Sequence, residues 1–316
     1  MESSLPALAP AAATPAPVAS LTAAAPACAS CGTILAGPYC YTCGEKRLHR
    51  HDYALRHFLE HNVDTLTHFD LRVLRDLCQQ LCRPGFLAAE WLQGRRIRHA
   101  QPVQLFLITN LLFYLVASVS HFSPFESKLE SHLHSLNGYS KFANRLVGQH
   151  LQQVPATALR YTAYARHFNE LAHGYSKSLV FLFIPLLAGP LWLLFWRQRR
   201  YFVEWIMLST YLFAGILLVY ALMAVFSLAV FVAPSLVSFF NDDGIISLVM
   251  VTLTLGYVAL FFHRAFPRQP GLRSWRKAAE GAMRGLKPFV FTFVFVLAMI
   301  VPYRFVLFLV CYWAAR

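Results

Sequence analysis

The sequence predicts an all-α integral membrane bundle of about five transmembrane helices, preceded by a small zinc-ribbon-like knuckle of four cysteines. Three observations support this fold class. Hydrophobic residues make up 57% of the 316 residues and charged residues only 14%, whereas a soluble domain is about half apolar and about a quarter charged. Apolar runs long enough to cross a bilayer recur from about residue 103 onward. Two Cys-x-x-Cys pairs precede these runs.

The first 27 residues are rich in Ala and Pro and carry almost no charge. A secretory signal has a basic start and an unbroken apolar stretch, whereas this segment starts with Glu2 and is interrupted by prolines. We therefore expect a disordered leader. The predicted division of the chain is a leader over 1–27, a knuckle over 28–47, a basic amphipathic neck over 48–102 and a membrane region over 103–316.

The knuckle contains Cys28, Cys31, Cys40 and Cys43, arranged as two Cys-x-x-Cys pairs that are each followed by glycine. Two such pairs can place four thiolates tetrahedrally around one Zn²⁺. A closed set of four sulfurs indicates structural zinc, because catalytic zinc keeps one coordination position open. The alternative is a redox dithiol, which is disfavoured because no βαβ pattern surrounds either pair. The short segment has little core, so the metal should supply most of its folding energy.

The neck is charged yet rhythmically apolar, with Leu74, Leu77 and Leu81 spaced as on one helix face. Arg-Pro-Gly at 83–85 breaks this helix, and a basic run at 94–102 stands directly before the first apolar run. The apolar face can lie in the headgroup layer or pack on the bundle, and the sequence leaves both interpretations open. The candidate contacts with anionic headgroups or with a partner are Arg83, Arg95, Arg96 and Arg98.

Two further cysteines, Cys78 and Cys82, lie four residues apart on the same predicted helix. We expect them to be a buried pair of small apolar side chains rather than metal ligands. Histidines are frequent in the first half of the neck, but their spacing is irregular, so no second metal site is predicted there.

The membrane region contains apolar runs separated by a long outer loop at 120–178. Lys and Arg gather in the neck and in the loops at 197–204 and 263–288, so the positive-inside rule predicts a cytoplasmic N-terminus and places 120–178 outside. The sequence does not decide whether the third and fifth runs are single spans. The predicted spans are about 103–119, 179–196, 205–233, 244–262 and 289–313.

With these features in place, the chain resembles an uncharacterised bacterial membrane-protein family, domain of unknown function 3667. The resemblance rests on "CASCG…YCYTCGEK", on "RPGFLAAEWLQGRRIRHAQPVQLFLITNLLFYLV" at 83–116 and, more loosely, on "FIPLLAGPLWLLF…RRYFVEW" at 183–205. It implies a zinc-ribbon start, membrane spans and a bacterial cytoplasmic (inner) membrane. His99 stands where an aromatic residue is usual, and Trp205 follows Glu204 where relatives often carry histidine. The resemblance implies no activity.

The sequence favours a membrane-embedded scaffold or regulatory docking protein with an unknown protein partner, because a closed zinc ribbon is commonly a rigid docking surface. The alternative is a small-solute or ion transporter or channel-like protein that uses Asn110, Glu204 and Arg304, since polar groups inside spans are usually functional. We expect no enzyme, because the chain has no catalytic motif. Nucleic acid is not an expected partner, because few basic residues flank the knuckle. The oligomeric state stays open.

Overall fold

The computed structural model describes residues 26–54, 72–120, 122, 124–134, 138–152, 158–194, 201–228, 243–266, 290 and 302–315. The chain divides into two compact units, Met1–Arg47 and Leu48–Arg316, which we describe separately. Several sequence predictions lie outside the described residues: most of the leader, the neck between 55 and 71, the basic loop beyond 266, and the last apolar run between 291 and 301.

The first unit is built from two copies of one turn, offset by 12 residues. In the first copy, Leu35 N–H donates to the Pro26 carbonyl at 2.9 Å, and in the second, Arg47 N–H donates to the Pro38 carbonyl at 2.8 Å. The two isolated β-bridges, Ala27 with Ile34 and Tyr39 with Lys46, follow the same offset. The described part of this unit therefore consists of turns and bridges, without a helix.

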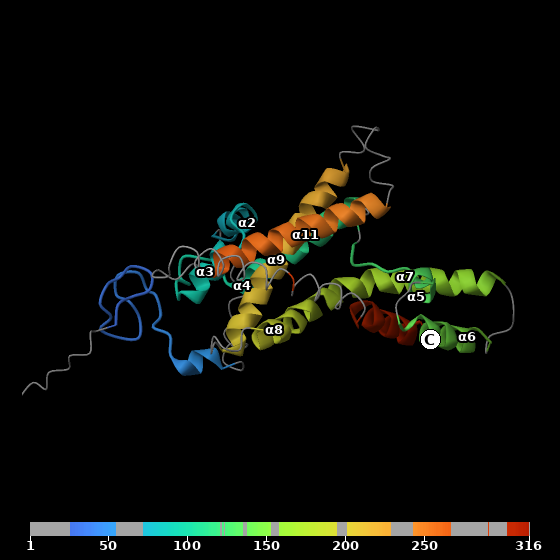
Figure 1. The fold of residues 1–316 in the computed structure, drawn as a ribbon, viewed down its shortest axis with the longest axis horizontal. Coiled ribbons are helices and arrows are strands. Elements are labelled where there is room, and N and C mark those ends of the chain that lie inside the picture. Colours follow the sequence, from blue (N-terminus) through green and yellow to red (C-terminus); the bar gives the residue numbers. More distant parts are fainter. Residues whose placement is uncertain are drawn as a thin grey trace, which may run out of the picture. The chain divides into compact units, whose positions relative to one another are not determined.

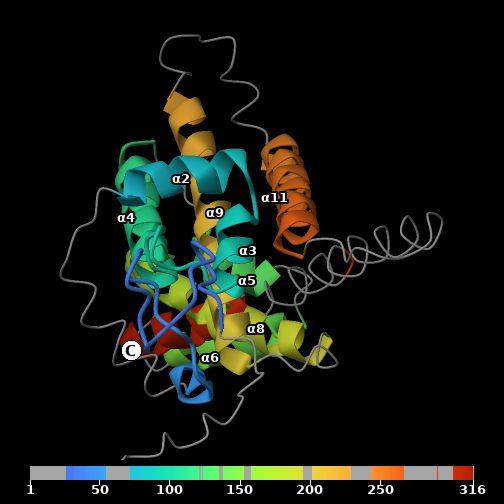
Figure 2. The same ribbon diagram turned by 90° about the vertical axis from the view of Figure 1, so that its left-hand side faces the viewer.

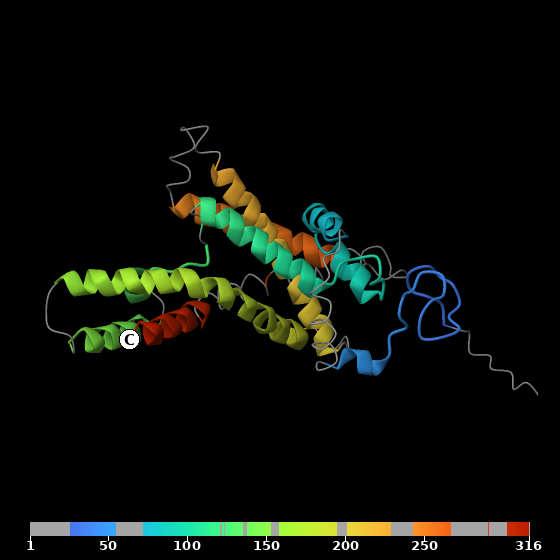
Figure 3. The same ribbon diagram turned by 180° about the vertical axis from the view of Figure 1, so that it is seen from behind.

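The second unit is helical, and four of its helices are long and apolar enough to cross a membrane. This confirms the all-α membrane bundle and the class of multi-pass membrane protein. A single rod, formed by α7, the 3₁₀ turn η2 and α8, contains one candidate span (Figures 1 and 3). The candidate spans are Pro102–Ser120, Tyr161–Leu193, Phe202–Leu228 and Leu248–Ala265.

The helix that contains the second candidate span begins well before the predicted segment at 179–196, because α7 continues without a break into the apolar residues that follow it. The helices of the bundle are α4 (Pro102–Ser120), α7 (Ala158–Leu179), η2 (Val180–Leu182), α8 (Phe183–Leu194), α9 (Phe202–Leu228) and α11 (Asp243–Ala265).

The core of the bundle lies where α4 and α8 pack along α9 (Figure 1). Phe106 and Phe113 of α4 are buried, and Phe183 of α8 stacks on Phe213 of α9 with ring centroids 5.2 Å apart. Large apolar side chains on the outer faces of these helices are exposed, as lipid contact requires. They include Leu111, Leu115, Val119, Leu193, Leu222 and Leu248.

The neck helices α2 (Arg72–Cys82) and α3 (Phe86–Leu92) pack on α9, and α3 also packs on α11 (Figure 2). The described part of the neck thus uses its apolar face against the bundle, which decides between the two interpretations left open by the sequence. The predicted face is corrected as well. Leu74 is 55% exposed, whereas Val73, Asp76, Leu77 and Gln80 point inward and are buried.

A smaller helical layer is formed by α5 (Leu129–His134), α6 (Ser140–Gln152), α7 and the C-terminal helix Pro302–Ala314. Figure 1 shows the C-terminal helix in red beside α6 and α7. Aromatic contacts join these elements, such as that between Phe168 and Phe308, whose ring centroids are 6.0 Å apart. The remaining described element is η1 (Arg50–Tyr53).

Candidate functional site

The four predicted ligands of the knuckle converge. Each of Cys28, Cys31, Cys40 and Cys43 offers a sulfur within 4.8 Å of the other three. The closest sulfur pairs join the two turns, since Cys28 lies 3.5 Å from Cys43 and Cys31 lies 3.5 Å from Cys40. This arrangement suits one ion coordinated by two residues from each turn. It is the one group of three or more potential metal ligands among the described residues.

Glycine allows each turn to close under its pair of sulfurs. Gly32 N–H donates to the Cys28 carbonyl at 2.9 Å, and Gly44 N–H donates to the Cys40 carbonyl at 2.8 Å. Their φ angles are +77° and +76°, in the left-handed region where a Cβ is strained. The two glycines that follow the Cys-x-x-Cys pairs therefore supply the backbone conformation that the turns need.

Hydrogen bonds favour the deprotonated, metal-binding form of two of the four sulfurs. At Cys43, by contrast, a backbone hydrogen bond from Glu45 is outweighed by burial and the neighbouring cysteine sulfurs, which raise the pKa of the thiol to about 12. Hydrogen bonds from the hydroxyl and amide of Thr33 lower the pKa of the Cys31 thiol to about 6. The backbone amide of Cys43 likewise lowers the pKa of Cys40. A thiolate is the metal-ligating form of cysteine, so these residues fit a soft divalent cation such as Zn²⁺.

The outer surface of the knuckle carries large apolar side chains. Ile34 is 63% exposed, Tyr39 is 59% exposed and Tyr41 is 77% exposed. Below them Glu45 is buried, and its Oε2 accepts a hydrogen bond from the Ser30 hydroxyl at 2.6 Å. So small a unit cannot bury these side chains in a core of its own, and each of them stays exposed.

The inward face of α2 carries a buried carboxylate that the sequence did not reveal. Asp76 is fully buried, and its Oδ2 accepts a hydrogen bond from Ala100 N–H at 2.6 Å. Its Oδ1 lies 3.1 Å from Nη2 of Arg75 and 3.2 Å from Nδ1 of His99. A buried carboxylate needs such partners. Asp76 therefore fixes the segment before α4 to the neck helix.

A second polar contact ties α2 to the spans. Gln80 is fully buried, and its Nε2 donates to the Tyr211 carbonyl in α9 at 2.6 Å. The Tyr257 hydroxyl in α11 donates to the Gln80 carbonyl at 3.0 Å. At the end of α2, Gly85 has a φ of +80°, and an added Cβ would stand 2.1 Å from the Phe261 carbonyl oxygen. The Arg-Pro-Gly turn is thus placed directly against the α11 backbone.

The four neck arginines differ in what they contact. Nη1 of Arg95 lies 3.1 Å from the Glu90 carboxylate, and the Arg96 guanidinium stands 3.8 Å from the centre of the Trp91 ring. Arg83 and Arg98 are exposed, and the Arg98 carbonyl accepts a hydrogen bond from Arg75. Arg95 and Arg96 therefore stabilise the neck itself, while Arg83 and Arg98 reach its surface.

The three predicted polar residues of the spans occupy separate surroundings. Glu204 lies in the first turn of α9, and its Oε2 accepts the Tyr201 N–H at 3.1 Å, as in a helix cap. Arg304 donates to the carbonyl and the hydroxyl of Ser131 at 3.3 and 2.5 Å. In the middle of α4, the Asn110 Oδ1 is buried and has no hydrogen-bond partner among the described residues. These residues do not form one site.

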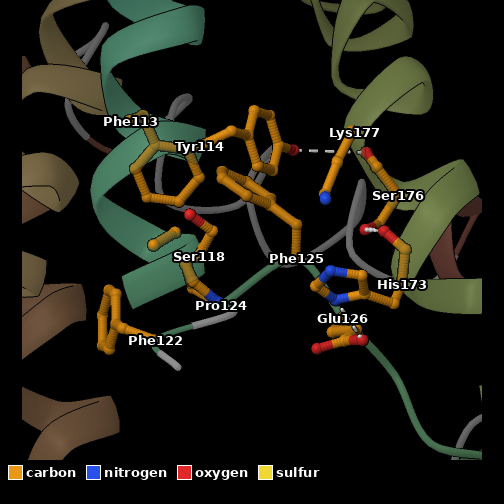
Figure 4. Close-up of a pocket in the computed structure, with 11 residues that line it drawn as sticks. Phe113, Tyr114, Ser118, Phe122, Pro124, Phe125, Glu126, His173, Ser176 and Lys177 are labelled. Carbon is orange, nitrogen blue, oxygen red and sulfur yellow. Dashed lines mark hydrogen bonds and ion pairs between the residues drawn. The ribbon is translucent and has the colours of Figure 1, made fainter. Parts of the chain in front are cut away.

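A small hollow lies between the end of α4, the segment after it and α7 (Figure 4). One wall is aromatic and includes Phe113 and Phe125; the other is polar and includes Lys177. His173 Nδ1 lies 2.8 Å from the Glu126 carboxylate at its rim. None of the predicted span residues lines this hollow.

The inward polar residues Asp76 and Gln80 were missed because leucine spacing alone located the face of α2. One sequence signal could have identified them. Asp76 and Gln80 are four residues apart and share a helical face with Val73 and Leu77.

Comparison with known proteins finds a family match, which covers part of the neck and the first part of α4. Residues 70–114 match the model of a family described as a protein of unknown function (DUF3667). The match begins just before α2 and ends within α4, so it contains Asp76, Gln80, Gly85 and the basic run. It confirms the resemblance predicted from the sequence over this segment. No curated protein and no solved structure matches the chain.

Proposed function

We propose that this protein is a docking scaffold of the bacterial cytoplasmic membrane, in which a zinc-folded knuckle presents a binding surface to a protein partner. The observation that carries the proposal is the combination of a closed four-sulfur site with exposed Ile34, Tyr39 and Tyr41. A closed site leaves no position for substrate, so its role is to hold a surface in shape. Aromatic residues are the side chains most enriched at protein interfaces.

The positive-inside rule supports a cytoplasmic position for the knuckle, because the neck that follows it is basic. A reducing cytoplasm would keep the four thiols free for metal. The bundle would then act as the anchor. Within this anchor, Gln80 and Gly85 fix the neck helix to α9 and α11.

The scaffold role is tested with cross-linked pull-downs from membranes that carry either the native chain or a Cys31→Ser, Cys43→Ser variant at matched membrane abundance. We expect a discrete set of partners with the native chain that is lost with the variant. Recovery of the same partners with both chains would show that the knuckle is not the docking surface.

Transport is the second candidate, and one observation favours it. The Asn110 Oδ1 is buried in α4 and is not bonded by any residue in the described part of the chain. A polar atom at this depth is costly unless it serves a function. Asn110→Ala should abolish solute flux in a transporter and leave partner recovery intact in a scaffold, so the same variant separates the two functions.

A further inference from the structure

The outward face of α2 carries two exposed thiols. We expected Cys78 and Cys82 to be buried, but both are exposed, because the inward face of the helix is occupied by Val73, Asp76 and Gln80. Free cysteine is among the most frequently buried residue types. Two exposed cysteines on one short helix are therefore unusual and suggest a chemical role for the thiols.

The two thiols have the spacing that lets helix side chains meet. Residues four apart lie on the same helical face with Cβ atoms roughly 5–6 Å apart. Sulfurs on such Cβ atoms can turn toward one ion between them. No described residue makes a hydrogen bond or ion pair with either sulfur, so both are available.

The helix that carries these thiols is held in place on its opposite face. The Asp76 carboxylate accepts the Ala100 N–H at 2.6 Å, and the Gln80 amide donates to the Tyr211 carbonyl at 2.6 Å. These bonds alternate with the cysteines along the same turns of α2. They fix its rotation, so the thiols are presented outward in a fixed orientation, and ligands held in advance bind metal more tightly.

We propose that Cys78 and Cys82 form a second metal site, which binds a soft monovalent cation, copper(I), between the two sulfurs. The number of ligands decides the metal. Zinc takes four ligands and is served by the knuckle, whereas two thiolates without further described ligands suit Cu(I), which soft sulfur selects. On binding, two S–H bonds break, two protons pass to solvent and two S–Cu bonds form. The copper stays Cu(I), so no oxidant or reductant is needed.

Two residues close to the two cysteines in sequence are positively charged, whereas the copper(I) dithiolate complex is negatively charged. One Cu(I) with two thiolates carries a net charge of −1. Arg75 lies three residues before Cys78 on the helix, and its side chain is 51% exposed. Arg83 follows Cys82 directly and is also exposed. The Arg75 guanidinium also pairs with the Asp76 carboxylate, and both arginines are close to the cysteines in sequence, where positive charge favours a complex of charge −1.

The test is site-resolved alkylation of the full-length, zinc-loaded protein in detergent. Cysteines are alkylated with iodoacetamide under reducing conditions, with and without buffered copper(I), and each cysteine is quantified by peptide mass spectrometry. This readout separates Cys78 and Cys82 from the knuckle. At a free copper(I) concentration ten times the dissociation constant, we expect alkylation of both to fall about tenfold together.

Cys82→Ser is the decisive variant, because one thiol alone should not hold the ion. In this variant we expect Cys78 to be alkylated equally fast with and without copper(I). Cys311→Ser is the matched control, since Cys311 is buried in the C-terminal helix, and it should leave the protection of Cys78 unchanged. Unprotected Cys78 and Cys82 in the native chain would overturn the proposal. So would protection of Cys78 that survives Cys82→Ser.

Discussion

At the scale of single residues, Gly85 decides where the neck meets the bundle. Its φ of +80° and the Phe261 carbonyl 2.1 Å from an added Cβ leave no room for a side chain. We predict that Gly85→Ala lowers the free energy of unfolding by about 2–5 kcal/mol, the sum of left-handed backbone strain and overpacking. Thermal unfolding in detergent measures the loss.

Gly256→Ala is the matched control, because Gly256 lies in α11, the same helix as Phe261, and an added Cβ would meet nothing within 4 Å. It should leave stability unchanged or raise it by up to about 1 kcal/mol. Equal destabilisation by the two variants would contradict the close approach between the neck and α11.

His132 gives the outer helical layer a dependence on pH. It is fully buried, and burial together with the nearby Arg304 lowers its pKa from 6.5 to about 4. Between these values the unfolded chain binds a proton that the folded chain does not, so stability falls as pH falls. The expected slope is about 1.4 kcal/mol per pH unit, or about 3 kcal/mol in all.

The measurement is the unfolding free energy of the native chain and of His132→Gln across this pH range. The variant should lose the slope assigned to this histidine. Parallel curves for the two chains would show that His132 does not titrate as its surroundings require.

At the scale of elements, the knuckle was predictable because its chemistry is local. Two Cys-x-x-Cys pairs and their glycines define the site within 17 residues, so no distant contact is needed to recognise it. The face of α2 was not predictable in this way. Leu74 follows the leucine spacing but is exposed, because Asp76 and Gln80 find partners in the segment before α4 and in α9. Those partners lie far away in the sequence.

Removal of the metal should unfold the knuckle and leave the bundle intact, because the two belong to separate compact units. Zinc contributes on the order of 10 kcal/mol to so small a fold. A peptide covering residues 26–50 should therefore be unstructured until zinc is added, as measured by circular dichroism. The same spectrum with and without a chelator would contradict this, and full-length protein should keep its helical signal in both states.

At the scale of the whole molecule, four of the five predicted spans correspond to helices that are long and apolar enough to cross a membrane, because a bilayer sets their length. The fifth predicted span lies partly outside the described residues. The ends of the helices that contain the spans were less predictable from the sequence. The second span starts within α7, where polar residues outside the apolar run continue the same helix. Sequence hydropathy locates the apolar part of a helix and not its polar extension, so the helix begins before the apolar run that was predicted as the span.

The orientation of the chain is tested with a new thiol at Gly138, an exposed position between α5 and α6 with open space around it. In spheroplasts, an impermeant maleimide should label Gly138→Cys and leave the native exposed thiols unlabelled, since the neck is cytoplasmic in our account. The native chain serves as the internal control. Labelling of Cys31 or Cys78 in intact spheroplasts would show that the orientation is the opposite of the predicted one.

The central claim is that the zinc-folded knuckle is the docking surface, and photo-cross-linking in cells tests it most directly. A benzophenone amino acid replaces Tyr41, which is 77% exposed, or Phe142 in α6 as the control, which is 44% exposed. We predict discrete protein adducts from position 41 that disappear with Cys31→Ser, Cys43→Ser and do not form from position 142. Adducts from position 41 that persist without the metal ligands, or none at all, would contradict the account.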